Sequence, residues 1–244
     1  MFLGDAVADD KGTTRPSRRR DPNGSAPFYS PRAKRPRERI LEAVLDVSGE
    51  LGYEQAAVQK VLDRAQASRG TFYNHFDDKE DCFVKAYEEA SEWLYRRLST
   101  IAARQPSWRD ELRVALAELL QFCANQENAA KALFIEAHAA GGDALAQHDR
   151  LMSKMAEAID MGRADLEGDA SPPPSTAAFM VGAIETLISG KLANGEAERA
   201  PGLLPGILHF VVLQYHGQEA AWEEMTSAPL ATWDAQRSRV AEAS

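Results

Sequence analysis

The sequence has little cysteine, no long apolar run and no alternating pattern of apolar and polar residues typical of strands. Its two cysteines, Cys82 and Cys123, lie far apart in a chain of 244 residues, which argues against a disulfide framework and fits a reducing cytosol. We expect two small buried side chains there, with a redox-sensing pair as the alternative. The longest apolar run, residues 207–213, contains His209, and no signal-peptide core follows Met1. The sequence therefore predicts a cytoplasmic protein that does not contact a membrane.

Patterns of catalytic and metal-binding residues are also missing. We find no pairing of a nucleophile with a base, no glycine-rich phosphate loop and no paired carboxylates, so an all-α enzyme is an alternative without support. His138 and His148 lie ten residues apart across the Gly141-Gly142 pair. A metal site needs further ligands at defined spacing, and the sequence shows none. We therefore expect no enzyme activity, no metal and no cofactor.

Positive charge is scarce overall and unevenly distributed. The net charge is −9, which is unfavourable for binding a polyanion. Residues 1–80 hold 14 of the 28 basic and 13 of the 37 acidic residues, a balance of +1, so that residues 81–244 carry −10. Only the first part of the chain can therefore approach nucleic acid without repulsion.

The most informative segment is residues 58–76, which has the pattern of two short helices joined by a turn. Val58, Val61, Leu62 and Ala65 recur at the spacing of one apolar helical face. Ser68 can then cap a second helix with its hydroxyl group. A core-facing helix followed by a polar one is the arrangement of a helix-turn-helix DNA-binding unit.

The second helix presents side chains that suit DNA, because Phe72 and Phe76 are four residues apart and point into the core. Arginine and asparagine side chains bond base edges in the major groove, whereas tyrosine and lysine suit phosphate oxygens. We thus expect Arg69 and Asn74 to contact bases. The full set predicted to bind DNA is Gln59, Ser68, Arg69, Gly70, Thr71, Tyr73, Asn74, His75 and Lys79.

These residues carry a resemblance to a known family. The run Ser68-Arg-Gly-Thr-Phe-Tyr-Asn-His-Phe76 followed by Lys79-Glu80 resembles the signature of the tetracycline-repressor (TetR) family of bacterial transcription regulators. Residues 39–47 and Leu51-Gly-Tyr-Glu fit the same family's first helix and its exit turn. The resemblance covers residues 36–85, and the rest of the chain only by length and helical pattern.

Two positions depart from the family pattern. Gln66 stands where the family usually has glycine in the interhelical turn, and a non-glycine residue at positive φ is strained there. Ala56-Ala57 replaces the threonine or serine that usually opens the preceding helix. This replacement removes a cap and a phosphate contact.

Helical periodicity and loop residues divide the chain into four parts. We expect a basic arm at residues 1–35, a three-helix DNA-binding domain at 36–80, a helical domain at 81–222 and an unassigned tail at 223–244. The arm is either a solvated tail, a segment that follows phosphates or enters a minor groove, or the product of a mis-assigned start codon. The helices expected after a long one from Asp77 or Asp78 are residues 108–124, 128–139, 144–166, 177–193 and 205–215.

The resemblance implies an all-α fold in which the second domain binds a small effector and forms a homodimer. Apolar positions that would line an effector cavity are Trp93, Phe122, Phe134, His138, Met152, Met155 and Phe179. Small and apolar positions for a four-helix dimer interface are Gly182, Leu187, Val211, Val212 and Tyr215, although a buried intrachain core explains the same pattern.

The function implied is a ligand-responsive repressor that binds a palindromic operator in double-stranded DNA as a dimer. A small, largely apolar effector, cationic if it pairs with the surplus carboxylates, would release it. The alternatives are a protein of the same fold that acts mainly through protein contacts, and constitutive DNA binding without an effector.

Overall fold

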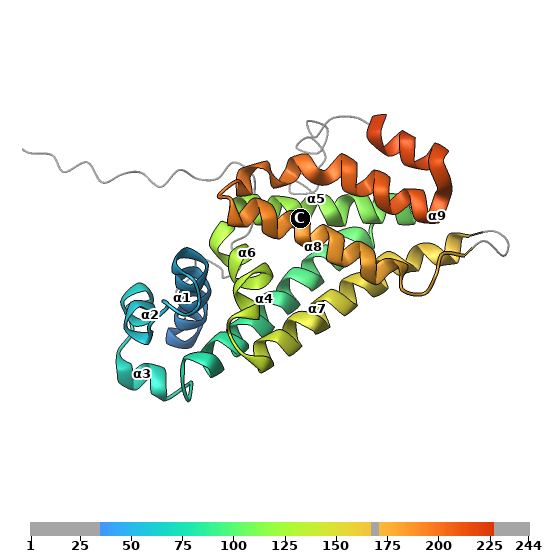
Figure 1. The fold of residues 1–244 in the computed structure, drawn as a ribbon. Coiled ribbons are helices and arrows are strands. Elements are labelled where there is room, and N and C mark those ends of the chain that lie inside the picture. Colours follow the sequence, from blue (N-terminus) through green and yellow to red (C-terminus); the bar gives the residue numbers. More distant parts are fainter. Residues whose placement is uncertain (1–34, 167–170, 227–244) are drawn as a thin grey trace, which may run out of the picture.

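The computed structural model describes residues 35–166 and 171–226, and every regular element in these ranges is a helix, as predicted (Figure 1). Three short 3₁₀ helices, η1 to η3, connect or extend the α-helices. Residues 1–34 of the arm predicted at 1–35, and the residues after 226, lie outside the described ranges. The elements are α1 (Pro36–Leu51), α2 (Val58–Ala65), α3 (Arg69–Tyr73), α4 (Lys79–Ala102), α5 (Trp108–Asn125), α6 (Glu127–Phe134), η1 (Glu136–His138), α7 (Gly142–Asp160), η2 (Met161–Asp165), α8 (Thr176–Ala193), η3 (Ala197–Leu203) and α9 (Leu204–Thr226).

The first three helices form one end of the molecule, and α4 runs from them into the remaining helices (Figure 1). Local signals set their limits. Pro36 occupies the first turn of α1, and Gly52 ends it at φ 86°, a conformation that glycine adopts without strain. The Asp78 carboxylate accepts a hydrogen bond from the Asp81 backbone N–H and caps α4.

Helices α4 to α9 bury their apolar side chains in a core that is continuous with the core of the first three helices. Helix α8 packs on α6 and α7, while α5 packs on α4 and η3. Tyr87, Leu94, Leu120 and Ile188 are essentially inaccessible to solvent. These side chains come from three helices, α4, α5 and α8. Helix α4 belongs to both domains, because it packs on α1 as well as on α5 and α7.

Four helical segments differ from the sequence prediction. The helix expected at residues 144–166 ends as α7 at Asp160 and continues as the 3₁₀ helix η2 to Asp165. The helix expected at residues 128–139 breaks at Ile135, where φ is −125° and ψ is −56°, and continues as η1. The helix expected to stop at residue 215 extends as α9 to Thr226 with a kink at Gly217, whose φ of 77° is open to glycine. η3 was not predicted.

Helix α8 also corrects the expectation about apolar stretches. It is the one helix in the described ranges with the length and composition of a membrane span, at a mean hydropathy of 1.2. Core helices of soluble proteins meet the same criteria, and α8 buries one side against α6 and α7. Its other side leaves Phe179 76% and Leu187 48% exposed. The apolar character of α8 therefore extends over two faces, one of which is uncovered in the single chain.

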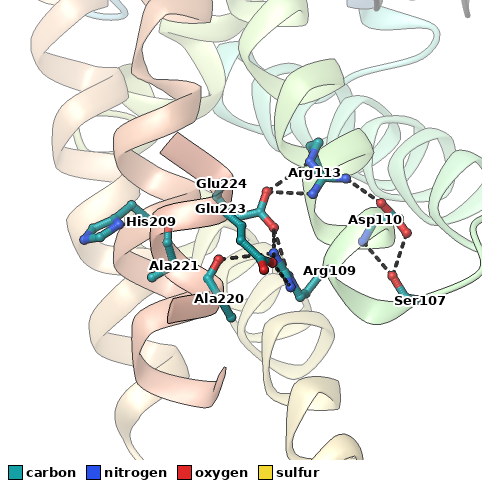
Figure 2. Close-up of polar contacts among 9 residues, drawn as sticks. All are labelled: Ser107, Arg109, Asp110, Arg113, His209, Ala220, Ala221, Glu223 and Glu224. Atoms are coloured by element: carbon teal, nitrogen blue, oxygen red, sulfur yellow. Dashed lines mark hydrogen bonds and ion pairs between the residues drawn. The ribbon is translucent and has the colours of Figure 1, made fainter. Parts of the chain in front are cut away.

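The last turns of α9 are tied to α5 by a buried carboxylate (Figure 2). The Glu224 side chain has no exposed surface, and its two oxygens accept hydrogen bonds from Arg109 Nη2 at 2.6 Å and Arg113 Nη2 at 2.7 Å. Arg109 also pairs with Glu223, which is 60% exposed. The segment assigned to an undefined tail thus begins with residues that belong to the core of the domain.

We predict that Glu224→Gln destabilises the last turns of α9, because it leaves Arg109 and Arg113 without their shared charge. Breaking a buried ion pair costs about 3–5 kcal/mol. When only the last turns of α9 detach, this cost lowers the free energy of their local opening. Urea unfolding and hydrogen exchange at residues 218–226 measure the effect. The control Glu223→Gln changes an exposed pair, which is worth about 1 kcal/mol or less. Equal effects of the two substitutions would contradict this account.

Candidate DNA-binding and ligand-binding sites

The turn between α2 and α3 holds the predicted recognition helix through Ser68. Its Oγ accepts a hydrogen bond from the Thr71 backbone N–H at 3.1 Å and lies 2.9 Å from Thr71 Oγ1. This confirms Ser68 as the N-cap. Phe72 and Phe76 are 1% and 2% exposed, with ring centroids 5.4 Å apart, so that they anchor the helix in the core as predicted.

Burial of these two rings turns the polar side chains outward. Tyr73 is 56% exposed, and Arg69 reaches back so that its Nη2 lies 3.5 Å from Gln59 Oε1 on α2. Seven of the nine residues predicted to bind DNA are therefore exposed on one surface, and Thr71 is half-buried beside them. The exposed residues are Gln59, Ser68, Arg69, Gly70, Tyr73, Asn74 and His75.

Lys79 is placed differently from its predicted role as a phosphate anchor. Its Nζ donates a hydrogen bond to the Tyr53 carbonyl at 2.8 Å and lies 3.9 Å from the centroid of the Tyr53 ring. Burial lowers the pKa of the Lys79 ammonium, and nearby Glu54 opposes this shift. The lysine thus ties the start of α4 to the turn after α1 with one of its three N–H groups, and its phosphate contact stays a prediction.

The two departures from the family pattern have the expected local consequences. Gln66 ends α2 with φ 51° and ψ 49°, and it is the one non-glycine residue at positive φ in the described ranges. Ala57 starts α2 without a side-chain hydrogen bond. Both ends of α2 therefore lack the residue that would stabilise them most.

We predict that Gln66→Gly raises the free energy of unfolding by about 1 kcal/mol, because a Cβ in the left-handed region costs about 1–2 kcal/mol and the gain in unfolded-chain entropy offsets part of it. Urea denaturation of the variants measures this value. Gln66→Asn should fall between glutamine and glycine, since asparagine tolerates this conformation. A Gly variant less stable than the native protein would show that Gln66 is not strained.

The DNA-binding helices are joined to the second domain where α1 crosses α6. A Cβ on Gly49 would lie 2.6 Å from Asn128 Cα, so the two helices meet backbone against backbone. Beside this crossing, Asn128 Nδ2 donates to Asp46 Oδ1 at 2.7 Å. A few residues on, the Tyr53 backbone N–H donates to Glu136 Oε2 at 2.6 Å. The last turn of α1 is therefore held against α6 at Gly49, and the turn after α1 is held against η1 at Tyr53.

A cavity of about 420 Å³ lies in the second domain among α4, α5, α7 and α8. Phe134, Met152 and Met155 line it, as predicted, whereas Trp93 and Phe122 pair with each other outside its lining. Phe179 points outward and is not a cavity residue. The unforeseen lining includes Tyr95, Leu98, Ala102, Trp108, Leu112, Leu116, Leu119, Met161, Val181, Ile184 and Ile188.

The charged groups of this cavity are all acidic. Glu111, Glu157 and Glu185 line it, and no lysine or arginine is among the described residues around it. Most of the wall is aliphatic or aromatic. Its volume and composition are those of sites for small, largely apolar molecules, and its charge favours a neutral or cationic group over an anionic one.

His138 does not line the cavity but joins a polar cluster beside it. His148 is 3% exposed, and its Nε2 lies 2.8 Å from Glu185 Oε1. Its Nδ1 lies 3.2 Å from the Leu133 carbonyl oxygen, and the His138 ring is centred 4.8 Å away. Burial alone lowers the pKa of His148, but the hydrogen bond and charge of Glu185 reverse this and raise it overall. The third ligand that the sequence did not show is thus Glu185, 37 positions further along the chain.

The predicted dimer residues separate into two groups. Gly182 and Leu187 are exposed on α8, but Val211, Val212 and Tyr215 are 0%, 0% and 4% exposed within the single chain. These three belong to the intrachain core, which corrects their assignment to an interface. This face of α9 packs on α5 and η3, and the Tyr215 hydroxyl donates to Asp160 Oδ1 at 2.8 Å.

Both cysteines are buried, free and unreactive, as expected for small core residues. Cys82 and Cys123 are each 0% exposed. Burial raises the pKa of both thiols, that of Cys123 to about 12. Since the thiolate is the reactive form, a redox-sensing pair does not fit this structure.

Comparison with known proteins agrees with the geometry of the first domain. Residues 40–86 match the sequence profile described as bacterial regulatory proteins, tetR family. The chain is also similar to the fatty acid metabolism regulator protein of Bacillus subtilis, with 26% identity over 98 residues, or 40% of this chain. That match spans 50% of the relative's length.

Solved structures resemble the whole fold. FadR from Bacillus halodurans, a fatty acid degradation regulator, has a TM-score of 0.61 at 16% identity, covering 72% of this chain and 97% of that one. FadR from Bacillus subtilis, solved with stearoyl-CoA, has a TM-score of 0.62 at 18% identity, covering 74% and 98%. SmeT, the repressor of a Stenotrophomonas maltophilia multidrug efflux pump, has a TM-score of 0.58 at 20% identity, covering 73% and 89%.

The fold and the exposed recognition helix define an all-α, helix-turn-helix protein of the transcription-regulator class. More specifically, the chain carries the DNA-binding domain of the bacterial tetR family, followed by a helical domain with the fold of that family's regulators.

Proposed function

We propose that the protein is a cytoplasmic, ligand-responsive transcriptional repressor. It binds a palindromic operator as a homodimer and is released when a small molecule enters the cavity of the second domain. The observation that carries this proposal is the backbone contact between α1 and α6 at Gly49 and Asn128. It joins an exposed recognition helix to the helix whose end, Phe134, lines the cavity.

In the DNA complex, α3 enters the major groove with Arg69 and Asn74 at base edges and Tyr73 at a phosphate. All three are exposed at the end of the molecule remote from α8 and α9 (Figure 1). Two such helices related by a two-fold axis read half-sites about 34–36 Å apart, or a multiple of that distance. The acidic second domain stays away from the phosphates.

Arg69→Ala should relax the sequence preference at one base pair of each half-site. A bidentate contact to a base contributes about 1–3 kcal/mol of discrimination, whereas loss of a phosphate contact weakens all sequences alike. Fluorescence anisotropy with a set of operators mutated one base pair at a time measures the preference. Arg199→Ala removes a 66% exposed arginine far from α3 and is the matched control. Uniform weakening by Arg69→Ala would make this residue an anchor and not a reader.

The dimer forms through the uncovered face of α8 and the start of α9. Phe179, Leu187 and Phe210 are 76%, 48% and 45% exposed on these helices, and Gly182 leaves open space above α8. Large apolar side chains beside a small residue allow two helices to approach closely. Covering this surface by a second copy removes apolar area from water and stabilises the dimer.

Leu187→Glu should convert the dimer to a monomer, because it places a charge in an apolar interface. Analytical ultracentrifugation at micromolar concentration measures the mass, and DNA binding tests the consequence for the operator. Leu145→Glu is the control, since Leu145 is 38% exposed on α7, outside this face. A Leu187→Glu protein that remains dimeric would place the interface elsewhere.

The effector is a small apolar molecule whose polar end is neutral or cationic. Glu111 and Glu157 repel an anionic group inside the cavity, whereas Glu185 is paired with His148. The Bacillus subtilis FadR structure contains stearoyl-CoA, which makes an acyl-CoA the competing candidate. Its acyl chain suits the apolar wall, but the cavity lining supplies no cation for its phosphates.

A series of ligands with one dodecyl chain and different charges distinguishes these candidates. We expect dodecyltrimethylammonium and dodecanol to bind more tightly than dodecanoate, by isothermal titration calorimetry below their micellar concentrations. Glu157→Gln should reduce the advantage of the cation. Tightest binding by dodecanoyl-CoA would contradict the charge argument and favour an acyl-CoA effector.

A further inference from the structure

Three side chains that can bind a metal come together from η1, α7 and α8. They are His138, His148 and Glu185, and one ligand atom from each lies within 4.8 Å of the others. Among residues 35–166 and 171–226, these three histidine and glutamate side chains form the one group that lies close enough together to hold a metal ion. It is separate from the DNA-binding surface and adjoins the cavity through Glu185.

The orientation of His148 is fixed by its surroundings. In the tautomer with a proton on Nδ1, this nitrogen donates to the Leu133 carbonyl oxygen at 3.2 Å and Nε2 is free to bind an ion. The Tyr87 hydroxyl packs against the same nitrogen at 3.1 Å. Nε2 then points its lone pair toward Glu185 and His138. Metal-binding histidines in proteins are oriented by such a bond from the other ring nitrogen to a carbonyl or carboxylate.

His148 Nε2 and Glu185 Oε1 lie 2.8 Å apart, so a ring nitrogen and a carboxylate oxygen already face each other as two ligands of one ion would. The site is secluded, since His148 is 3% and the Glu185 side chain 20% exposed. His138 is exposed and can rotate to add a third donor.

We propose that His138, His148 and Glu185 bind a divalent transition-metal ion, Zn²⁺ in particular, with the fourth position left to water or to a ligand. Two imidazoles and one carboxylate form a donor set that zinc accepts. Zinc bonds of about 2.0–2.2 Å place tetrahedral ligand atoms about 3.3 Å apart. The separations of up to 4.8 Å close to that distance by a movement of about 1–2 Å of the exposed His138 ring, and the 2.8 Å pair of His148 and Glu185 opens by about 0.5 Å.

Zinc would link η1, α7 and α8 next to the contact with the DNA-binding domain. Glu136, two residues before His138, accepts the hydrogen bond from the Tyr53 backbone N–H at 2.6 Å. A metal that fixes η1 therefore also fixes this bond. Any effect of zinc on operator affinity rests on the proposed function, whereas zinc binding itself does not.

The test is a zinc titration of the full chain without an affinity tag, after removal of metals by a chelator. Competition with a chromophoric zinc indicator gives affinity and stoichiometry, and Co²⁺ reports four-coordination by its visible spectrum. We expect one Zn²⁺ per chain and a rise in Tm with zinc. His138→Gln should weaken binding by at least about tenfold, and it should fold normally because the side chain is exposed.

His209→Gln is the matched control, because it removes a histidine of α9 that lies outside the cluster and should leave zinc affinity unchanged. Glu185→Gln keeps the shape of the third ligand but lowers its charge, and it should weaken binding as His138→Gln does. Equal zinc affinities in the native protein, His138→Gln and Glu185→Gln would overturn the proposal. Failure of DNA binding in all of these proteins would instead count against the proposed function alone.

Discussion

The closest contact between the two parts of the molecule is the crossing of α1 and α6, and the arrangement of the other helices depends on it. At Gly49 the helices touch through their backbones, so neither can slide without breaking the bond from Asn128 to Asp46. The end of α6 then reaches the cavity through Phe134 and the buried His148 through the Leu133 carbonyl. Close-packed elements of this kind shift between discrete positions more readily than they deform.

This arrangement explains how a ligand could affect DNA without touching the DNA-binding helices. A ligand shifts an equilibrium only by its differential affinity for the two states. α4 contributes to this connection, because Lys79 holds its first turn on Tyr53 while Leu98 of its later turns lines the cavity. Two physical links, α4 and the pair of α6 with η1, thus join the cavity to the recognition helix.

The sequence predicted well those features that local residues determine. The caps at Ser68 and Asp78, the stop at Gly52 and the strained Gln66 depend on neighbours within a few positions. The run of residues from 68 to 80 therefore predicted which side chains α3 buries and which it exposes. The bond from Lys79 to Tyr53, 26 positions away, was not predicted.

Features that depend on distant residues were beyond the sequence pattern. Which side of α9 faces inward is decided by packing against α5 and η3, so Val211 and Val212 could not be told from interface residues by periodicity alone. The break at Ile135 and the meeting of Glu185 with His148 likewise follow from tertiary packing. The sequence predicts the helices that form the cavity, but not how each helix is rotated about its axis relative to its neighbours.

The most direct test of the account is hydrogen exchange with and without operator DNA, using the duplex next to the protein's own gene that binds in a gel shift. The account predicts that DNA slows exchange in residues 35–85 and also in residues 127–138, which join the DNA-binding helices to the cavity. In Glu136→Gln the second effect should decrease while the first remains. Protection confined to residues 35–85 in the native protein would contradict coupling between the two sites.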